Sequence, residues 1–380
     1  MSSRLLAIVP LVAGLTVASI PLDAAHACGG FFRTETTQNL AIDAQRALFV
    51  WHEKTVDVHL QLVAATDGGD FAWVVPVPVQ PELSLGDEAI FESLDTLTTP
   101  SITFDRDSGG GGGFCGSADA AGGLAPNQSG VTHFGGGVLG DYQWDVITGV
   151  TTEAVGTWLG DHGYVLPEGF ADAAQPYLDG GMRFLAVTLT PTAQDSALDL
   201  QPLVVTMERP GDSKLVFPLG FSRLSAVDVT PIVLYVLADK RYRVSNAANV
   251  ELDTVASELG DRFDGGEELD YEAAVDDLTS DAGGRFVVTE FASDIGDIPS
   301  LSGELNALLA EDADAHYLTR LYARVPRASL DDMVITFANE AGDVNNHQTA
   351  DAGGAGKETA LAFAFISLLL ATGVVRRRAG

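Results

Sequence analysis

The sequence predicts an α+β fold built mostly from antiparallel sheets with a few packed helices, plus one transmembrane helix near the C-terminus. Segments with alternating or continuous apolar residues outnumber segments with helical periodicity. Most neighbouring strand segments are joined by short turn sequences, which favour hairpins over crossover connections. The transmembrane helix is predicted from the uncharged run 359–375, which is followed directly by three arginines.

The composition is typical of a folded protein with an acidic surface. Hydrophobic residues make up 46% of the chain, which is enough for one large or two modest domains and excludes a wholly disordered protein. The 53 acidic and 21 basic residues give a formal net charge of -32. Such a surface repels nucleic acid and anionic lipid, so nucleic-acid binding is excluded as the function.

The N-terminus has the order of regions found in an export signal. Arg4 precedes the apolar segment 5–17, and Ala25-His26-Ala27 is the small-x-small pattern that signal peptidase reads. Proline and glycine interrupt the apolar segment, whereas a membrane span needs about 20 apolar residues in a row. We therefore expect residues 1–27 to be a signal peptide, cleaved between Ala27 and Cys28.

Cys28 and Cys115 are the two cysteines of the sequence. In an exported protein the oxidising compartment makes a disulfide between them the expected arrangement. The closed loop would stabilise the fold by roughly 4 kcal/mol in the chain-entropy model. Lipidation of Cys28 is the alternative, although Ala25 stands where a lipoprotein signal has leucine.

Three strands rich in apolar residues are predicted early in the exported body, at 46–51, 55–63 and 71–75. His52-Glu53-Lys54 and the segment 67–70 have turn compositions, so successive hairpins are expected. Pro76 and Pro78 lack backbone donors, which means that the third strand ends there or runs along a sheet edge.

A first helix is expected between Asp87, which can cap it, and Pro100, which ends it. Its apolar residues recur at steps of three and four: Ile90, Phe91, Leu94 and Leu97. Helices are also expected at about 152–161, 169–179, 271–278 and 301–309. Further strands are expected at 101–104, 142–148, 182–189, 203–207, 214–217, 232–237, 285–290, 317–324 and 333–337, with a Pro210-Gly211-Asp212 turn joining 203–207 to 214–217.

Two segments of the body are expected to lack regular structure. Residues 107–140 are dominated by glycine and are predicted to form a long mobile surface loop tied down at Cys115, with a subdivision of the body near residue 141. Residues 246–266 are polar and acidic and are expected to form an excursion from the fold.

The C-terminal part predicts an anchor. An extracytoplasmic body, 28–344, is followed by a small and polar tether, 345–358, and by the membrane helix 359–375. Arg376, Arg377 and Arg378 stop transfer, which leaves 376–380 as a basic cytoplasmic tail and the body outside. The same order of segments resembles C-terminal sorting signals, so processing by a sorting protease, with release or surface display, is the alternative to a permanent anchor.

The chain contains no sequence motif for a zinc protease, a nucleophile elbow or a phosphate-binding loop, so no catalytic, cofactor-binding or metal-binding residues are predicted. Acidic clusters at 261–268 and 312–314 offer oxygen ligands for Ca²⁺ but lack the alternating pattern of a calcium loop. Four tryptophans in apolar segments are expected to pack in the core rather than to stack on sugars: Trp51, Trp73, Trp144 and Trp158.

Several motifs resemble a bacterial exported family described as domain of unknown function 2330. They are Cys28-Gly29-Gly30-Phe31-Phe32, Asp70-Phe71-Ala72-Trp73-Val74-Val75-Pro76-Val77-Pro78, Glu88-Ala89-Ile90-Phe91, Trp158-Leu159, Gly163-Tyr164-Val165-Leu166-Pro167, Gln201-Pro202-Leu203, Val236-Leu237-Ala238-Asp239-Lys240-Arg241-Tyr242, Phe286-Val287-Val288-Thr289-Glu290-Phe291 and Leu318-Thr319-Arg320-Leu321-Tyr322-Ala323-Arg324. The resemblance covers Cys28 to about Phe337. It implies an envelope protein without assigned chemistry and adds no catalytic residues. Many members have a further cysteine where this chain has Arg33, so the family's cysteine arrangement does not transfer directly.

The sequence therefore predicts an exported, membrane-anchored envelope protein whose body is a non-catalytic binding or structural module. Its expected partners are signal peptidase, a C-terminal sorting protease, the membrane, and an envelope protein or glycan. Two alternatives remain open. One is an envelope hydrolase whose site is assembled from scattered residues. The other is a calcium-dependent or glycan-binding surface adhesin, in which carboxylates would converge on one Ca²⁺ ion.

Overall fold

The computed structural model describes residues 25–26, 30–34, 41–65, 71–105, 131–190, 201–211, 214–262, 270–311, 314–339 and 341–351. Most of the predicted signal peptide, both cysteines, residues 107–130 of the predicted glycine loop, the run 359–375 and Arg376 to Arg378 lie outside these ranges. Within them, no helix has the length and apolar character needed to cross a membrane.

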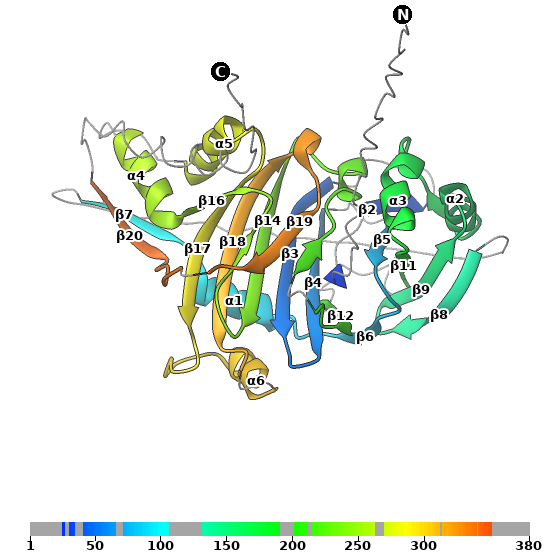
Figure 1. Cartoon of the computed structure of the whole chain (residues 1–380), viewed down its shortest axis with the longest axis horizontal. Coiled ribbons are helices and arrows are strands. Elements are labelled where there is room, and N and C mark those ends of the chain that lie inside the picture. The colour runs from blue at the N-terminus through cyan, green and yellow to red at the C-terminus, as the bar shows by residue number, and fades with distance from the viewer. Residues whose placement is uncertain are drawn as a thin grey trace, which may run out of the picture.

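The described strands form four sheets (Figure 1). The largest has the order β16 (Ala248–Glu251), β17 (Phe286–Asp294), β18 (Tyr317–Pro326), β14 (Val229–Ala238), β3 (Ala41–Trp51), β4 (Thr55–Ala65), β12 (Leu203–Glu208) and β6 (Glu82–Leu85). The second has the order β10 (Tyr164–Val165), β2 (Gly30–Thr34), β5 (Phe71–Val77), β11 (Arg183–Leu189), β9 (Tyr142–Gly149) and β8 (Val131–Leu139). Two small sheets contain β1 (Ala25–His26), β13 (Leu215–Phe217), β19 (Met333–Phe337) and β15 (Tyr242–Val244), and then β20 (His347–Asp351) with β7 (Ser101–Asp105).

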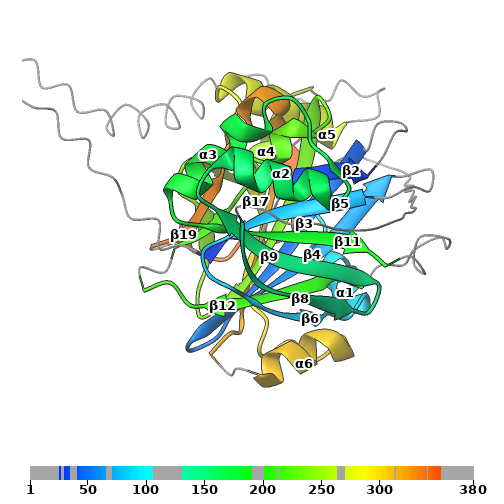
Figure 2. The ribbon, with the colours of Figure 1, turned by 90° about the vertical axis from the view of Figure 1, so that its right-hand side faces the viewer.

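Six α-helices of the described chain pack on these sheets: α1 (Ala89–Thr98), α2 (Thr152–Asp161), α3 (Phe170–Asp179), α4 (Leu252–Arg262), α5 (Tyr271–Asp281) and α6 (Gly303–Glu311). α2 and α3 lie together beside the six-stranded sheet (Figure 2). The other four pack on one face of the eight-stranded sheet. Most strand pairs are antiparallel, so the predicted α+β class is confirmed.

Strict alternation of side chains along the strands separates the apolar cores. In β3, Phe49 and Trp51 face the core shared with the six-stranded sheet, whereas Leu48 and Val50 face the helices. The same alternation places Val56, Val58 and Leu60 of β4 in the first core. Because both faces of β3 are covered at its C-terminal end, residues 47–51 form a continuous apolar run.

Local signals placed most elements correctly. The β3–β4 turn is closed by the His52 amide, which donates to the Thr55 carbonyl oxygen at 2.9 Å. Asp87 accepts from the Ala89 amide at 2.9 Å at the start of α1, as a capping residue should. α2 has the predicted bounds, and the Thr151 side chain caps it by accepting from the Ala154 amide.

Two predicted hairpins are wrong. β5 does not return along β4 but lies between β2 and β11, while β4 pairs with β3 and β12. Likewise β12 and β13, which a Pro210-Gly211-Asp212 turn was expected to join, belong to different sheets. A turn sequence reverses the chain, but the apolar surface that each strand must bury decides its neighbour.

β5 ends at Val77, between the two prolines, which is the first of the two outcomes expected for this strand; it does not run along an edge, because it lies between β2 and β11. Pro76 pairs with Phe184 of β11, but the described pairing with β2 stops at Val74. Proline has no backbone N–H, but Pro76 lies beyond the described pairing with β2, so no hydrogen bond between β5 and β2 is lost there.

The predicted glycine loop is wrong over its last part, because residues 131–139 form β8 and pair with β9. The Trp144 ring packs over this strand, within 3.9 Å of the position that a Cβ would take at Gly135 and 3.5 Å at Gly137. An aromatic side chain that covers glycines in this way supplies the packing that they lack.

Two further segments are more ordered than expected. Of the predicted excursion 246–266, residues 248–262 form β16 and α4, because Leu252, Val255 and Leu259 recur on one buried helix face. Of the predicted tether 345–358, residues 347–351 form β20, which pairs in parallel with β7. Residues 352–358 lie outside the described ranges.

Candidate functional site

Four polar side chains extend from neighbouring strands into the helix-covered face of the eight-stranded sheet: Arg46 of β3, Tyr235 of β14, Arg320 of β18 and Glu290 of β17. Tyr235 and Arg320 are directly paired in the ladder. The register of β17 against β18 shifts between Thr289 and Phe291, so Glu290 is the extra residue of a bulge. The topology thus brings together charges that lie far apart along the chain.

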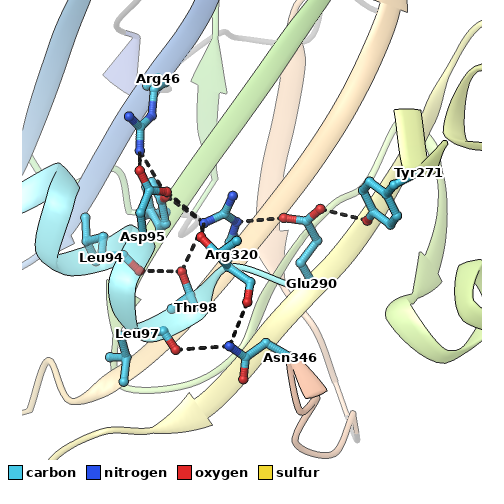
Figure 3. A network of polar contacts seen from close by, with 11 residues as sticks. Arg46, Leu94, Asp95, Leu97, Thr98, Tyr271, Glu290, Arg320 and Asn346 are labelled. Carbon is cyan, nitrogen blue, oxygen red and sulfur yellow. Dashed lines mark hydrogen bonds and ion pairs between the residues drawn. The ribbon is translucent and has the colours of Figure 1, made fainter. Parts of the chain in front are cut away.

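Arg320 is the centre of this network (Figure 3). Its Nε donates to Glu290 Oε2 at 2.6 Å, and its Nη1 donates to Asp95 Oδ1 at 2.9 Å and to the Tyr235 hydroxyl at 3.0 Å. The same nitrogen contacts the hydroxyls of Thr98 and Thr99 at the end of α1. The guanidinium therefore joins three elements, β17, β14 and α1.

Asp95 of α1 is the carboxylate that pairs with both arginines of the network. It accepts from the Tyr235 hydroxyl at 2.6 Å and also pairs with Arg46. The Arg46 guanidinium lies 5.3 Å from the centre of the Phe91 ring, one helical turn before Asp95. α1 is thus held to β3, β14 and β18 through one carboxylate.

The network reaches two further elements. Tyr271 of α5 donates to Glu290 Oε1 at 2.7 Å. Asn346, in the segment before β20, donates to the carbonyl oxygens of Leu97 and Thr99 at 3.2 and 3.0 Å. The Leu97 carbonyl lies in the last turn of α1, which has no further helical donors, and the Thr99 carbonyl directly follows the helix, so Asn346 caps α1 from a distant part of the chain.

Burial and neighbouring charges act in opposite directions on the two carboxylates. Burial raises the pKa of Glu290 above its ordinary value, although Arg320 and Tyr271 oppose this. Burial would also raise the pKa of Asp95, but Arg46, the Tyr235 hydroxyl and Arg320 outweigh it and hold that pKa below its ordinary value. The two arginines, Arg46 and Arg320, carry the same amount of formal charge as the two carboxylates, with opposite sign. Ionised groups in a protein interior need such pairing to offset the cost of removing them from water.

Comparison with known proteins identifies the family of this chain. Residues 22–337 match the family described as an uncharacterized protein conserved in bacteria, DUF2330. The chain belongs to this family. Neither the curated proteins nor the solved structures include a match.

The DUF2330 region contains every charged member of the network, from Arg46 to Arg320, whereas Asn346 lies beyond it. Glu290 and Arg320 both lie within the motifs that resemble the family, but those motifs do not predict that the two side chains meet. One sequence signal could have found these residues: a single charged residue within or next to an apolar strand segment. Arg46 directly precedes Ala47-Leu48-Phe49, and Arg320 directly precedes Leu321. Such a charge needs a buried partner.

A partly buried carboxylate in the DUF2330 region, Asp332 directly before β19, connects that strand to α3. Asp332 Oδ1 accepts from the Tyr177 hydroxyl at 2.6 Å and from the Gly220 amide at 2.9 Å. Burial raises the pKa of Asp332. The adjacent cavity, lined by Arg285, Ser329, Asp331 and Asp332 among others, has a volume of about 20 Å³, so it has room for about one water molecule.

The residues weighed in the sequence analysis do not form a site in the described chain. Trp51, Trp73 and Trp158 are at most 4% exposed, and Trp144 packs against the same core as Trp51, which confirms the core expectation. Among the described residues there is no group of three or more His, Cys, Asp or Glu side chains that could hold a metal ion. Of the acidic clusters, 263–268 and 312–313 lie outside the described ranges, as do Ala27, Cys28, Cys115 and Arg376 to Arg378.

Proposed function

We propose that this DUF2330 protein is an exported cell-envelope protein whose body is a non-catalytic structural or binding module, held at the membrane by its C-terminal segment. The proposal for export and anchoring rests on the signal-like N-terminus and on the uncharged run 359–375 before Arg376, Arg377 and Arg378. Cys28 and Cys115 are proposed to form a disulfide in the oxidising compartment.

The Arg320 network is the observation that favours a non-catalytic body. A catalytic acid, base or oxyanion donor must keep a position open for the substrate. Here the Arg320 and Glu290 side chains are only 9% and 2% exposed, and both are engaged with each other and with neighbouring elements. The arrangement fixes α1, α5 and the segment containing Asn346 on the sheet, which is a structural role.

Hydrolase assays test the absence of catalysis. The full chain, purified in detergent, is offered chromogenic esters, glycosides and phosphomonoesters and a peptide library, and we expect no turnover above that of a heat-denatured sample. Asp95→Asn is the diagnostic variant, because Asp95 is the network carboxylate nearest to solvent, at 36% side-chain exposure. Asp277→Asn, at a carboxylate that is 65% exposed on α5, is the control. Turnover that Asp95→Asn abolishes and Asp277→Asn preserves would establish an enzyme instead.

Fusions to alkaline phosphatase, which is active only outside the cytoplasm, test export and topology. A fusion after residue 351 is expected to be active, and a fusion after residue 380 inactive. Deleting residues 2–27 should abolish the activity of the fusion after residue 351. An active fusion at residue 380 would contradict the cytoplasmic tail, and inactivity at residue 351 would contradict export.

A free-thiol assay tests the proposed disulfide. In the purified, unreduced protein we expect neither Cys28 nor Cys115 to react, and both to react after reduction. Two reactive thiols without reduction would refute the disulfide. Mass spectrometry of the N-terminal peptide separates this result from lipidation of Cys28, which would leave Cys115 reactive. Crosslinking in cells, followed by identification of the crosslinked proteins, would then find the partner of a binding module.

A further inference from the structure

Residues 341–351 form a strap that follows the DUF2330 region and reaches from β17 to β7 (Figure 1). Val344 exchanges two backbone hydrogen bonds with Ala292 of β17, at 2.7 and 2.9 Å. The pairing of β17 with β16 stops at Thr289, so the strap covers the same edge of β17 where β16 ends. The strap then runs in parallel beside β7 as β20.

Few buried side chains hold the strap on the body. Among its described side chains, those of Val344, Asn346 and Ala350 are buried. In β14, by contrast, residues 232–238 are buried without interruption. Segments with few buried apolar contacts open at a lower free energy than the core. We therefore expect the strap to leave the body while the eight-stranded sheet stays folded.

Two polar side chains of the body bind the start of the strap. Arg241 Nη1 donates to the Gly342 carbonyl oxygen, and the Tyr317 hydroxyl donates to Asp343 Oδ1, each at 2.6 Å. Gly342 and Asp343 are exposed. Water can replace such bonds when the strap leaves, so they oppose its opening only modestly.

β7 depends on the strap for its pairing. In the described chain its one strand partner is β20, and an isolated pair of strands is only marginally stable. The Ser101 amide also donates to the Asn346 carbonyl oxygen at 2.7 Å. Ser101 and Thr103 have exposed side chains, and Ile102 is half-buried. β7 is therefore expected to lose its order together with the strap.

The strap supports the Arg320 network from the side of α1. The Asn346 side chain donates to the carbonyl oxygens of Leu97 and Thr99. The Thr99 hydroxyl in turn accepts from Arg320 at 3.3 Å. Loss of the strap removes the donor that caps α1 next to this contact.

The strap also supports the network from the side of α5. Val344 is buried in a small apolar cluster against which Tyr271 packs. The Tyr271 hydroxyl donates to Glu290, the carboxylate that pairs with Arg320. The strap therefore contacts the groups on both sides of the buried ion pair.

We propose that the strap is a latch, which opens as one unit with residues 99–105 and thereby loosens the contacts of Thr99 and Tyr271 with the Arg320 network. The eight-stranded sheet stays folded in the open state. In the anchored protein, tension on the chain after residue 351 reaches the strap before any other described element. This last consequence rests on the proposed anchoring, whereas the opening itself does not.

Hydrogen–deuterium exchange of the full chain in detergent, at urea concentrations below the unfolding transition, tests the latch. Peptides from 341–351 and 99–105 should exchange through one common opening, with a weaker urea dependence than peptides from β14, because the opening exposes less surface than global unfolding. Strap peptides that exchange only together with β14 would overturn the proposal. Fast exchange of the strap with unchanged protection of 99–105 would also overturn it.

Three variants sharpen this test. Asn346→Ala should speed the exchange of 341–351 and of 99–105 by the same factor, about tenfold, because the docked state loses a buried donor. Asn306→Ala, which removes a donor to two backbone carbonyls at α6, should leave both segments unchanged.

Val187→Ala leaves a cavity in the core at β11, so it should speed the exchange of β14 but not that of the strap. A strap that is accelerated as much as β14 in Val187→Ala would show that it opens only by global unfolding, which contradicts the latch. The alkaline phosphatase fusions test the anchor separately, so the latch and the anchor can fail independently.

Discussion

The Arg320 guanidinium meets the Glu290 carboxylate across strands β18 and β17, with 2.6 Å between Nε and Oε2. The two side chains are 9% and 2% exposed. At this depth water cannot replace a missing partner, so removing either residue leaves a buried, unpaired charge. The pair differs in this respect from the exposed ion pairs on the helices.

Arg320→Met is expected to lower the free energy of unfolding by about 3–5 kcal/mol, because Glu290 and Asp95 both lose their shared partner. Urea unfolding followed by circular dichroism measures this. Arg262→Met is the control, since Arg262 pairs with Glu258 and Asp277 at 36% side-chain exposure, and it should cost about 1 kcal/mol or less. Equal losses of unfolding free energy in the two variants would mean that the buried network contributes no more to stability than an exposed ion pair.

Glu290→Gln together with Arg320→Met should recover much of the loss of Arg320→Met alone, because the double variant no longer buries the uncompensated Glu290 charge. A double variant as unstable as the sum of the two single variants would show that the two residues act independently. The same urea unfolding experiment decides between these outcomes.

The stability contributions of Asp95 and Asp332 are expected to change with pH in opposite directions. The pKa of Asp95 is lowered from 3.8, so its stabilising contribution is present above pH 3.8 and is lost as the pH falls further. The pKa of Asp332 is raised from 3.8, so its contribution is full below pH 3.8 and is lost as the pH rises through the raised value.

Urea unfolding of Asp95→Asn and Asp332→Asn between pH 3 and pH 7 checks this. The deficit of Asp95→Asn relative to the unmodified chain should grow with pH, and that of Asp332→Asn should shrink. Parallel pH profiles in the two variants would contradict the different environments of the two carboxylates.

Asn346→Ala is expected to destabilise the fold by about 1–3 kcal/mol, because the carbonyls of Leu97 and Thr99 at the end of α1 lose the donor that the buried Asn346 side chain supplies. Asn306→Ala is a matched control. Asn306 also donates to two backbone carbonyls, those of Leu301 and Ser302, but at the surface, where water replaces it. Thermal unfolding of both variants compares them. A similar loss in each would show that residues 341–351 do not support α1.

His59 is expected to remain neutral well below the usual range of histidine. Burial lowers the pKa of His59 from 6.5 to about 4, with Asp57 opposing and His52 adding to the shift. Stability present above pH 6.5 is therefore lost as the pH falls toward 4, because the unfolded chain binds the proton first. NMR titration of the imidazole signal, assigned with His59→Asn, measures the midpoint. A midpoint near 6.5 would show that the imidazole is exposed to water.

Sequence alone predicted the individual elements well where the signal is local. The periodicity of Val155, Trp158 and Leu159 predicted α2 without reference to any other part of the chain. The alternation of Val56, Val58 and Leu60 defines the buried face of β4 in the same way. Glycine content misled the prediction at β8, because an edge strand tolerates residues with little side-chain packing when a neighbour such as Trp144 covers them.

By itself, the sequence determined where strands and helices form and which of their faces are apolar, because both depend on residues a few positions apart. Only the tertiary structure decided which strands are neighbours and which charges meet. Arg46 and Asp95 are 49 positions apart, and Arg320 and Asp95 are 225 positions apart. A charge within an apolar strand signals that a partner must exist, but the partner is selected by sheet order, by the bulge at Glu290 and by the packing of α1, all of which arise only when the whole chain folds.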